Sequence, residues 1–231
     1  MTLSQDLLLA NDDLWPTLTG HPFVTAAADG TLPAGAFDRW IVADHAFVVA
    51  FRRFLAGLLA IAPTEDARDL LAGSLAPLQE ELDLFRGEAA DRGLDLAVEP
   101  ALVELGYSAF LLASLADGWA TALTILYGAE KAYSDAWTAV RATAAADSPH
   151  WSFIDNWSSP AFAAWVDRIG KLVDVLPAHD WPAAHVAFRR VVRFESAFWD
   201  SVLTPWRGTP RRPPARAASS SETRARDCRR Q

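Results

Sequence analysis

The chain has 231 residues, of which 51% are hydrophobic and 22% charged, and this composition is typical of a globular protein and excludes disordered and fibrous classes. Of its 21 basic and 29 acidic residues, eight arginines but only Glu222 and Asp227 lie in residues 207–231. Residues 1–206 therefore carry 13 basic and 27 acidic side chains, and this acidic balance disfavours nucleic-acid binding.

The N-terminal sequence lacks a basic region, and Asp6 interrupts its short apolar run, so we expect no signal peptide. The single cysteine, Cys228, cannot form an internal disulfide, which favours a reducing, cytoplasmic location. Residues 107–129 contain one charge, Asp117, followed by Gly118. This pair predicts a break between two buried helices rather than a membrane span.

Apolar spacings of three and four residues recur along the chain, whereas the alternation typical of strands is nearly absent. The first helix is predicted from Phe37 for about five turns, after the start signals Thr31 and Pro33. The second is predicted from Thr64 to Arg92, with Gly93 as its stop. Further helices are predicted over residues 101–116, 118–145, 159–175 and 181–203.

No internal repeat or linker divides residues 1–206, which predicts an all-α fold made of a single-domain helical bundle. The Pro-, Arg- and Ser-rich residues 207–231 show no apolar periodicity and are predicted to form a disordered basic tail. Because charge runs of this kind are usually solvated, we assign the tail no partner.

Some apolar helix faces carry polar side chains that an ordinary core would exclude, because an unpaired buried charge is costly. Three predicted helices have a carboxylate on that face, and a fourth has a phenol: Asp44, Glu130, Glu195 and Tyr107. One interpretation is that each group is satisfied locally, the carboxylates by Arg52, Arg53 or Arg193. The other is that the four faces meet in one pocket, where neighbouring carboxylates raise one another's pKa as general acid/base catalysis requires.

Metal and cofactor chemistry is not indicated by these residues. A di-iron bundle needs Glu-x-x-His pairs, but Phe198 follows three residues after Glu195, and Tyr133 three residues after Glu130. The five histidines show no metal-ligand spacing, and a heme would depend on His21 alone. The sequence also lacks a glycine-rich phosphate loop and a G-x-S-x-G motif. We therefore predict no metal and no cofactor.

Five short motifs occur in a fixed order: HPF at 21–23, GTLP at 30–33, FxxWIxxD at 37–44, SSPAF at 158–162 and FESAFW at 194–199. In this order they resemble the TenA/thiaminase II family over residues 14–203. The resemblance implies a heme-oxygenase-like all-α fold without heme. It also implies cleavage of thiamin, or hydrolysis of aminopyrimidine breakdown products of thiamin, by a protein that is often a dimer or tetramer.

The resemblance assigns roles to several residues. Asp44 matches the aspartate that holds the aminopyrimidine through its ring nitrogen and exocyclic amine. Glu195 matches a glutamate that acts as acid/base at the leaving group, and Tyr107 matches an active-site tyrosine. The family's nucleophilic cysteine falls on Glu130, within a segment, GAEKAY at 128–133, that is similar to the glutamate-bearing branch of the family. A carboxylate replaces a thiolate poorly as a nucleophile but can activate water.

Further substrate contacts are expected from Phe47, Tyr133 and Trp157. Phe47 stands where the family often has a stacking tyrosine, Trp157 where a pocket tyrosine is usual, and Phe85 where a histidine often lies. These departures imply a more apolar pocket than the thiaminase pattern.

These observations favour a cofactor-free hydrolase that acts on an aminomethyl- or formylaminomethyl-pyrimidine and releases hydroxymethylpyrimidine. Its expected partners are the small pyrimidine substrate and further copies of the chain. Two alternatives stay open: a non-catalytic pyrimidine-binding or regulatory protein on the same fold, and a thiaminase II. An oxidase using a metal or a quinone is disfavoured by the shortage of metal ligands.

Overall fold

The computed structural model describes residues 1–204, and the predicted basic tail at 207–231 lies outside the described residues. The described part consists of helices without strands. Their bounds are α1 Leu3–Leu9, α2 Pro16–Thr19, α3 Pro22–Asp29, α4 Ala36–Ile61, α5 Glu65–Arg92, α6 Leu102–Ser114, η1 Leu115–Asp117, α7 Trp119–Thr143, α8 Trp151–Ser158, α9 Pro160–Asp174, η2 Ala178–Asp180 and α10 Trp181–Leu203.

The all-α, single-domain fold is confirmed, and the long helices lie where they were predicted. Helix α4 is longer than the predicted five turns, because it continues to Ile61 and has 26 residues. The start and stop of α5 are formed as expected. The Thr64 hydroxyl accepts a hydrogen bond from the backbone N–H of Ala67 at 3.3 Å, which satisfies a free amide of the first turn. At the other end, Gly93 has a φ of 66°, a left-handed conformation that glycine adopts without strain.

Four short helices, α1, α2, α3 and α8, were not predicted. Each has eight residues or fewer, which is too short for a periodic apolar pattern to be recognised. The helix predicted over 101–116 ends earlier, at Ser114, and continues as the 3-10 turn η1. The break predicted at Gly118 is present, because this residue has a φ of 93° and precedes α7.

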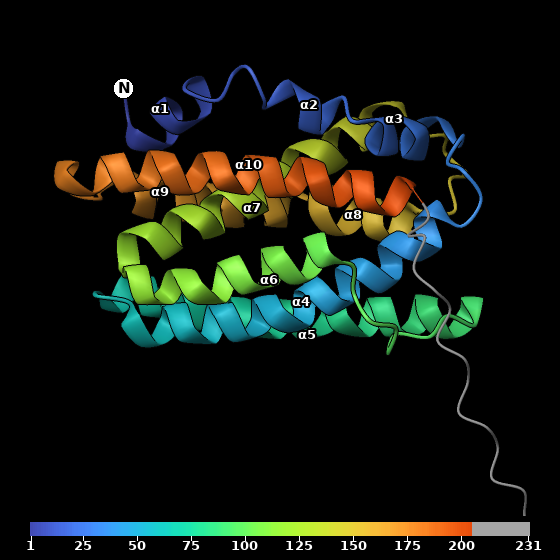
Figure 1. The fold of residues 1–231 in the computed structure, drawn as a ribbon, viewed down its shortest axis with the longest axis horizontal. Coiled ribbons are helices and arrows are strands. Elements are labelled where there is room, and N and C mark those ends of the chain that lie inside the picture. The colour runs from blue at the N-terminus through green and yellow to red at the C-terminus, as the bar shows by residue number, and fades with distance from the viewer. Residues whose placement is uncertain (205–231) are drawn as a thin grey trace, which may run out of the picture.

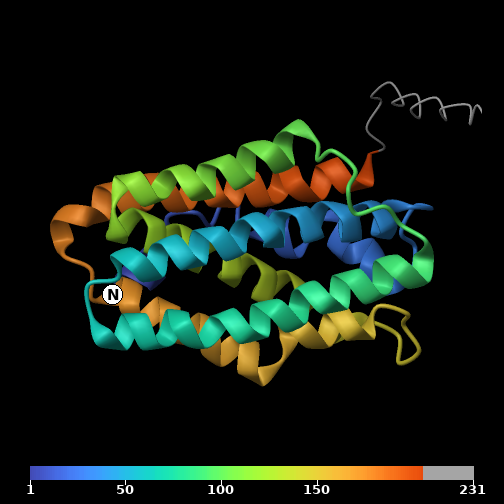
Figure 2. The same ribbon diagram turned by 90° about the horizontal axis from the view of Figure 1, so that it is seen from below.

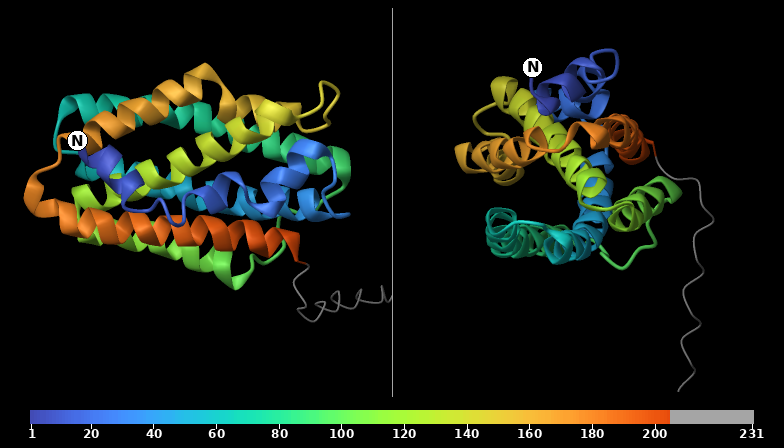
Figure 3. Two further views of the ribbon diagram at one scale, coloured as in Figure 1. Left: turned by 90° about the horizontal axis from the view of Figure 1, so that it is seen from above. Right: turned by 90° about the vertical axis from the view of Figure 1, so that its left-hand side faces the viewer.

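The central helix of the bundle is α7, which packs against α10, α9, α8 and α3. Helices α4 and α5 form an antiparallel pair, and α6 lies beside α4 (Figures 1 and 2). Viewed from the end, α7 crosses the middle of the molecule, with the short N-terminal helices at one side and the α4–α5 pair at the other (Figure 3). The space between α4, α5, α7 and α10 therefore lies at the centre of the fold.

Large aromatic rings fill the end of this central space. Trp40 packs against Trp137 at 5.2 Å and edge-on against Phe153 at 4.9 Å between ring centroids. Phe153 stacks on Trp157 at 5.9 Å. Such rings bury much apolar surface and hold the helices at fixed separations. Within residues 1–204, no helix has the length and apolar character needed to cross a membrane.

Candidate functional site

Polar side chains from α4, α5, α7 and α10 meet in a small cavity of about 40 Å³. Its walls are otherwise mostly apolar. The lining residues are Asp44, Phe47, Val48, Phe51, Leu78, Glu81, Ala129, Glu130, Tyr133, Trp157 and Glu195. The three carboxylates singled out in the sequence therefore line one space.

Two of these carboxylates are each held by a tyrosine from another helix. The hydroxyl of Tyr133 donates to Oδ1 of Asp44 at 2.6 Å, and the hydroxyl of Tyr107 donates to Oε1 of Glu195 at 2.5 Å. Asp44 and Glu195 are each only 1% exposed. Their second oxygens, Oδ2 of Asp44 and Oε2 of Glu195, have no hydrogen-bond partner. Each buried carboxyl group thus retains one free oxygen for a ligand.

Pairing with arginine does not account for these groups. Among residues 1–204, no ion pair involves Asp44, Glu130 or Glu195. Arg52, one of the arginines considered as a partner, instead donates to Gln79 at 2.8 Å. The interpretation in which the helix faces meet in one pocket is therefore the one that fits the structure.

Burial changes the proton affinity of these groups. It raises the pKa of Glu195 to about 8, although the hydrogen bond from Tyr107 acts in the opposite direction. Burial also raises the pKa of Asp44 well above its usual value. The hydrogen bond from Tyr133 opposes this shift, while the nearby charges of Glu81 and Glu195 increase it. Near neutral pH, the carboxyl group of Glu195 can therefore donate as well as accept a proton.

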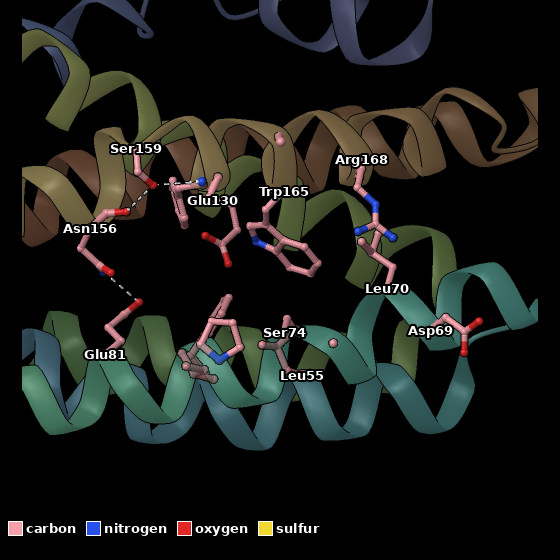
Figure 4. A pocket seen from close by; sticks show the side chains of 17 residues that line it. Leu55, Asp69, Leu70, Ser74, Glu81, Glu130, Asn156, Ser159, Trp165 and Arg168 are labelled. Atoms are coloured by element: carbon pink, nitrogen blue, oxygen red, sulfur yellow. Dashed lines mark hydrogen bonds between the residues drawn. The ribbon is translucent and has the colours of Figure 1, made fainter.

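A larger cleft of about 390 Å³ adjoins the cavity between α5 and α9. The cavity and the cleft share four lining residues, Phe51, Leu78, Glu81 and Glu130, and so lie directly side by side. Figure 4 shows Glu130 and Trp165 pointing into the cleft, with Arg168 and Asp69 farther along it. Its size falls in the range of small-molecule sites.

Glu130 lies where the cleft meets the cavity, and its side chain is half-buried. Burial raises its pKa to about 8, and the charge of Glu81 adds to the shift. A carboxyl group with this pKa is partly ionised near neutrality and can accept a proton from water. The thiol that a nucleophilic mechanism would need is not in the described part of the chain, because the only cysteine is Cys228.

The other residues predicted from the sequence either line the cavity or lie just outside its lining. Phe47 and Trp157 line the cavity, as expected of ring contacts. Tyr107 does not line the cavity and reaches it through Glu195, while its ring lies 4.7 Å from that of Phe47. Phe85 is fully buried behind Trp157, with 5.9 Å between the ring centroids.

Glu81 was missed by the sequence reasoning. It lines both the cavity and the cleft and accepts a hydrogen bond from the side-chain amide of Asn156 at 3.3 Å. A signal was present, since Glu81 lies three residues after Leu78 and four before Phe85 on the apolar face of α5. It was overlooked because Leu82, the next residue, already fits the apolar face. In addition, Glu80 and Glu81 together form an acidic pair of the kind usually found on an exposed helix surface.

The described residues include no group of three or more His, Cys, Asp and Glu side chains placed to hold a metal ion. His45, next to Asp44 in sequence, packs edge-on against Phe85 at 6.4 Å, and both of its ring nitrogens lack partners. It does not line the cavity.

Comparison with known proteins links this chain to one family. The sequence pattern of the TENA/THI-4/PQQC family matches residues 10–204. A soybean (Glycine max) protein named "Probable bifunctional TENA-E protein" is 24% identical over 199 residues, which cover 81% of this chain and 87% of that protein.

Solved structures share the fold. A TenA homologue from Pyrococcus furiosus is 31% identical, with a TM-score of 0.83 over 87% of this chain and 100% of the other. A protein from Silicibacter described as a TenA family transcription regulator is 24% identical, with a TM-score of 0.78 over 85% and 96% of the two chains. The second likeness concerns the fold alone.

Proposed function

Because this chain belongs to the TENA/THI-4/PQQC family, we propose that it is a hydrolase that releases hydroxymethylpyrimidine from an aminomethyl- or formylaminomethyl-pyrimidine. The resemblance noted in the sequence is confirmed by this match, and family membership supports a role in thiamin metabolism. The observation that carries the proposal is the pair of tyrosine-held carboxyl groups, Asp44 and Glu195, each with a free oxygen on one aromatic cavity.

Asp44 is proposed to recognise the aminopyrimidine edge. With Oδ1 fixed by Tyr133, the carboxyl group can accept from the exocyclic amine and share its proton with the adjacent ring nitrogen. Its raised pKa suits this pairing, because the acid and the weakly basic ring share one proton between them. Phe47 and Trp157 supply the ring faces against which a flat heterocycle packs.

Glu195 is proposed to protonate the departing amine. Its pKa of about 8 keeps much of it protonated near neutral pH, as a general acid must be. The hydroxyl of Tyr107 fixes Oε1, so Oε2 is the oxygen available to the leaving group.

Glu130 is proposed to activate the attacking water. It lies at the junction of cavity and cleft, where water can enter and where the bond to the leaving amine would lie. A carboxylate at this position favours hydrolysis over covalent catalysis, because it is a much weaker nucleophile than a thiolate.

The proposal is tested by incubating the purified full-length chain separately with thiamin, aminomethylpyrimidine and its N-formyl derivative. Products are identified by mass spectrometry, with Glu195→Gln run alongside. Hydroxymethylpyrimidine from the second or third compound, absent with the variant, is the expected result. Tight binding of these compounds without any product would contradict hydrolysis and favour a pyrimidine-binding or regulatory protein. Product from thiamin alone would favour a thiaminase.

A further inference from the structure

Glu81 is a carboxylate of the site that the family resemblance does not account for. It projects from α5, on the side of the cleft opposite Glu130 of α7, and the two side chains point into the same space (Figure 4). Both residues also line the inner cavity. Glu81 and Glu130 therefore both stand at the boundary between the cleft and the cavity that contains Asp44.

In the described part of the chain, no basic side chain pairs with Glu81, so an ion pair does not explain its position in the site. Within residues 1–204 it forms no salt bridge, and the hydrogen bonds that it accepts come from neutral donors, the side-chain amide of Asn156 and the indole of Trp157. Asn156 lies in the last turn of α8, where its backbone carbonyl oxygen accepts a hydrogen bond from the Ser159 hydroxyl at 3.3 Å. This amide fixes the direction of the carboxyl group without neutralising its charge.

The ionisation of Glu130 depends on the charge of Glu81. Burial raises the pKa of Glu81 to about 7, and the Asn156 hydrogen bond opposes the shift. The charge of Glu81 helps to raise the pKa of Glu130 to about 8. The other titratable groups that face the pair are Asp44, Tyr133 and Glu195 in the cavity, with Asp69 and Arg168 along the cleft. Apart from Arg168, these groups are acidic, so ionisation of both glutamates together is disfavoured.

We propose that Glu81 is a second catalytic carboxylate, which shares one proton with Glu130 across the cleft and, with it, holds the attacking water. This inference rests on the proposed hydrolysis. The free oxygens of Asp44 and Glu195, both deeply buried, mark the cavity that Glu81 and Glu130 also line as a ligand site.

In the proposed step, the water oxygen forms a bond to the methylene carbon, and the carbon–nitrogen bond breaks with its electron pair going to nitrogen. The proton lost by water goes to whichever of Glu81 and Glu130 is ionised. The nitrogen takes its proton from Glu195, which becomes a carboxylate. Return of one proton from the glutamate pair to Glu195, through water in the cleft, restores the starting state.

The kinetic test compares Glu81→Gln, Glu130→Gln and the double variant with the full-length protein between pH 5 and 9. Glu80→Gln is the matched control, because Glu80 is the exposed neighbour on the same helix. We expect Glu81→Gln to lower kcat by about 100-fold with little change in KM, the scale of a lost acid/base group. The double variant is expected to be little worse than either single variant, because the pair acts as a unit. Glu80→Gln should behave as the unaltered protein.

A second measurement does not depend on turnover. Carbon-13 NMR of labelled glutamate carboxyl groups should show the pair titrating in two steps, and Glu81→Gln should leave Glu130 with one step at lower pH. A kcat for Glu81→Gln within about 3-fold of Glu80→Gln would overturn the inference even though hydrolysis is observed. If no compound is hydrolysed, the proposed function fails, and an unchanged Glu130 titration in the variant would overturn the pairing as well.

Discussion

The hydroxyl of Tyr133 donates to Oδ1 of Asp44 at 2.6 Å, although 89 positions separate the two residues in the sequence. The same arrangement is repeated by Tyr107 and Glu195, which are separated by 88 positions and joined at 2.5 Å. In each pair a phenol fixes one carboxyl oxygen and leaves the other free. The site is thus built from two similar units, one proposed for recognition and one for proton transfer.

Removing the Tyr133 hydroxyl should weaken recognition of the pyrimidine. A hydrogen bond to a charged group contributes about 1.5–3 kcal/mol, so Tyr133→Phe is expected to weaken binding of hydroxymethylpyrimidine by roughly 10- to 100-fold in calorimetry. Tyr127→Phe is the matched control, since Tyr127 lies on the same helix and does not line the cavity. Equal affinity of the two variants would remove Tyr133 from the binding site.

Changes at Glu195 and Tyr107 should reduce turnover in a graded way. Glu195→Gln is expected to bind product but to lose about 100-fold or more in kcat, as for a lost general acid. Tyr107→Phe keeps the acid but removes the hydrogen bond that lowers its pKa. The basic limb of its pH–rate profile should therefore move to higher pH. Near-normal turnover of Glu195→Gln would exclude this residue from the mechanism.

Exchange of Glu130 for cysteine should not create a thiaminase. The variant Glu130→Cys supplies a thiol at the junction of cavity and cleft, but Phe47 and Trp157 keep the cavity wall apolar. We expect no thiamin cleavage when products are measured by mass spectrometry. Strong cleavage would show that these aromatic side chains do not decide the substrate.

Stability should fall as the pH rises through neutrality. The pKa of Glu195 is raised in the folded state from 4.5 to about 8, so the folded protein binds a proton that the unfolded chain releases between these values. The free energy of unfolding therefore decreases with pH in this window. Urea denaturation of Glu195→Gln should show a smaller decrease, by an amount on the order of a few kcal/mol. Glu80→Gln should keep the full slope, and an equal slope in both variants would contradict the shifted pKa.

Close packing of α7 on α10 should make Gly128 intolerant of a side chain. A Cβ at this position would lie 3.1 Å from Val191 and 3.3 Å from Phe188, both on α10. Gly128→Ala is expected to destabilise the protein by about 1–3 kcal/mol through overpacking. In α5, Gly87 has no atom within 4 Å of such a Cβ, and Gly87→Ala should stabilise by up to about 1 kcal/mol. Thermal unfolding of both variants tests whether the first lowers and the second raises the stability. Equal stability of the two variants would show that α10 can move to accommodate a side chain at Gly128.

The sequence by itself determined the helical class, the long helices and three of the carboxylates. The reason is local: a carboxylate on an apolar helix face, such as Asp44 or Glu195, stands out against the periodicity around it. The helix ends at Thr64 and Gly93 could also be predicted from the sequence, because capping depends on the chemistry of residues within a few positions of the end.

Only the tertiary structure decided which groups meet. The pairing of Tyr133 with Asp44, and the position of Tyr107 behind Glu195, depend on how α4, α6, α7 and α10 pack, and periodicity along one helix carries no information about its neighbours. Glu81 shows the same limit, since it differs from Glu80 only by the rotation of about 100° per residue that turns it from solvent into the cleft. Glu81 faces a site only because α7 and α8 lie opposite α5. Contacts between residues far apart in the sequence produce that arrangement.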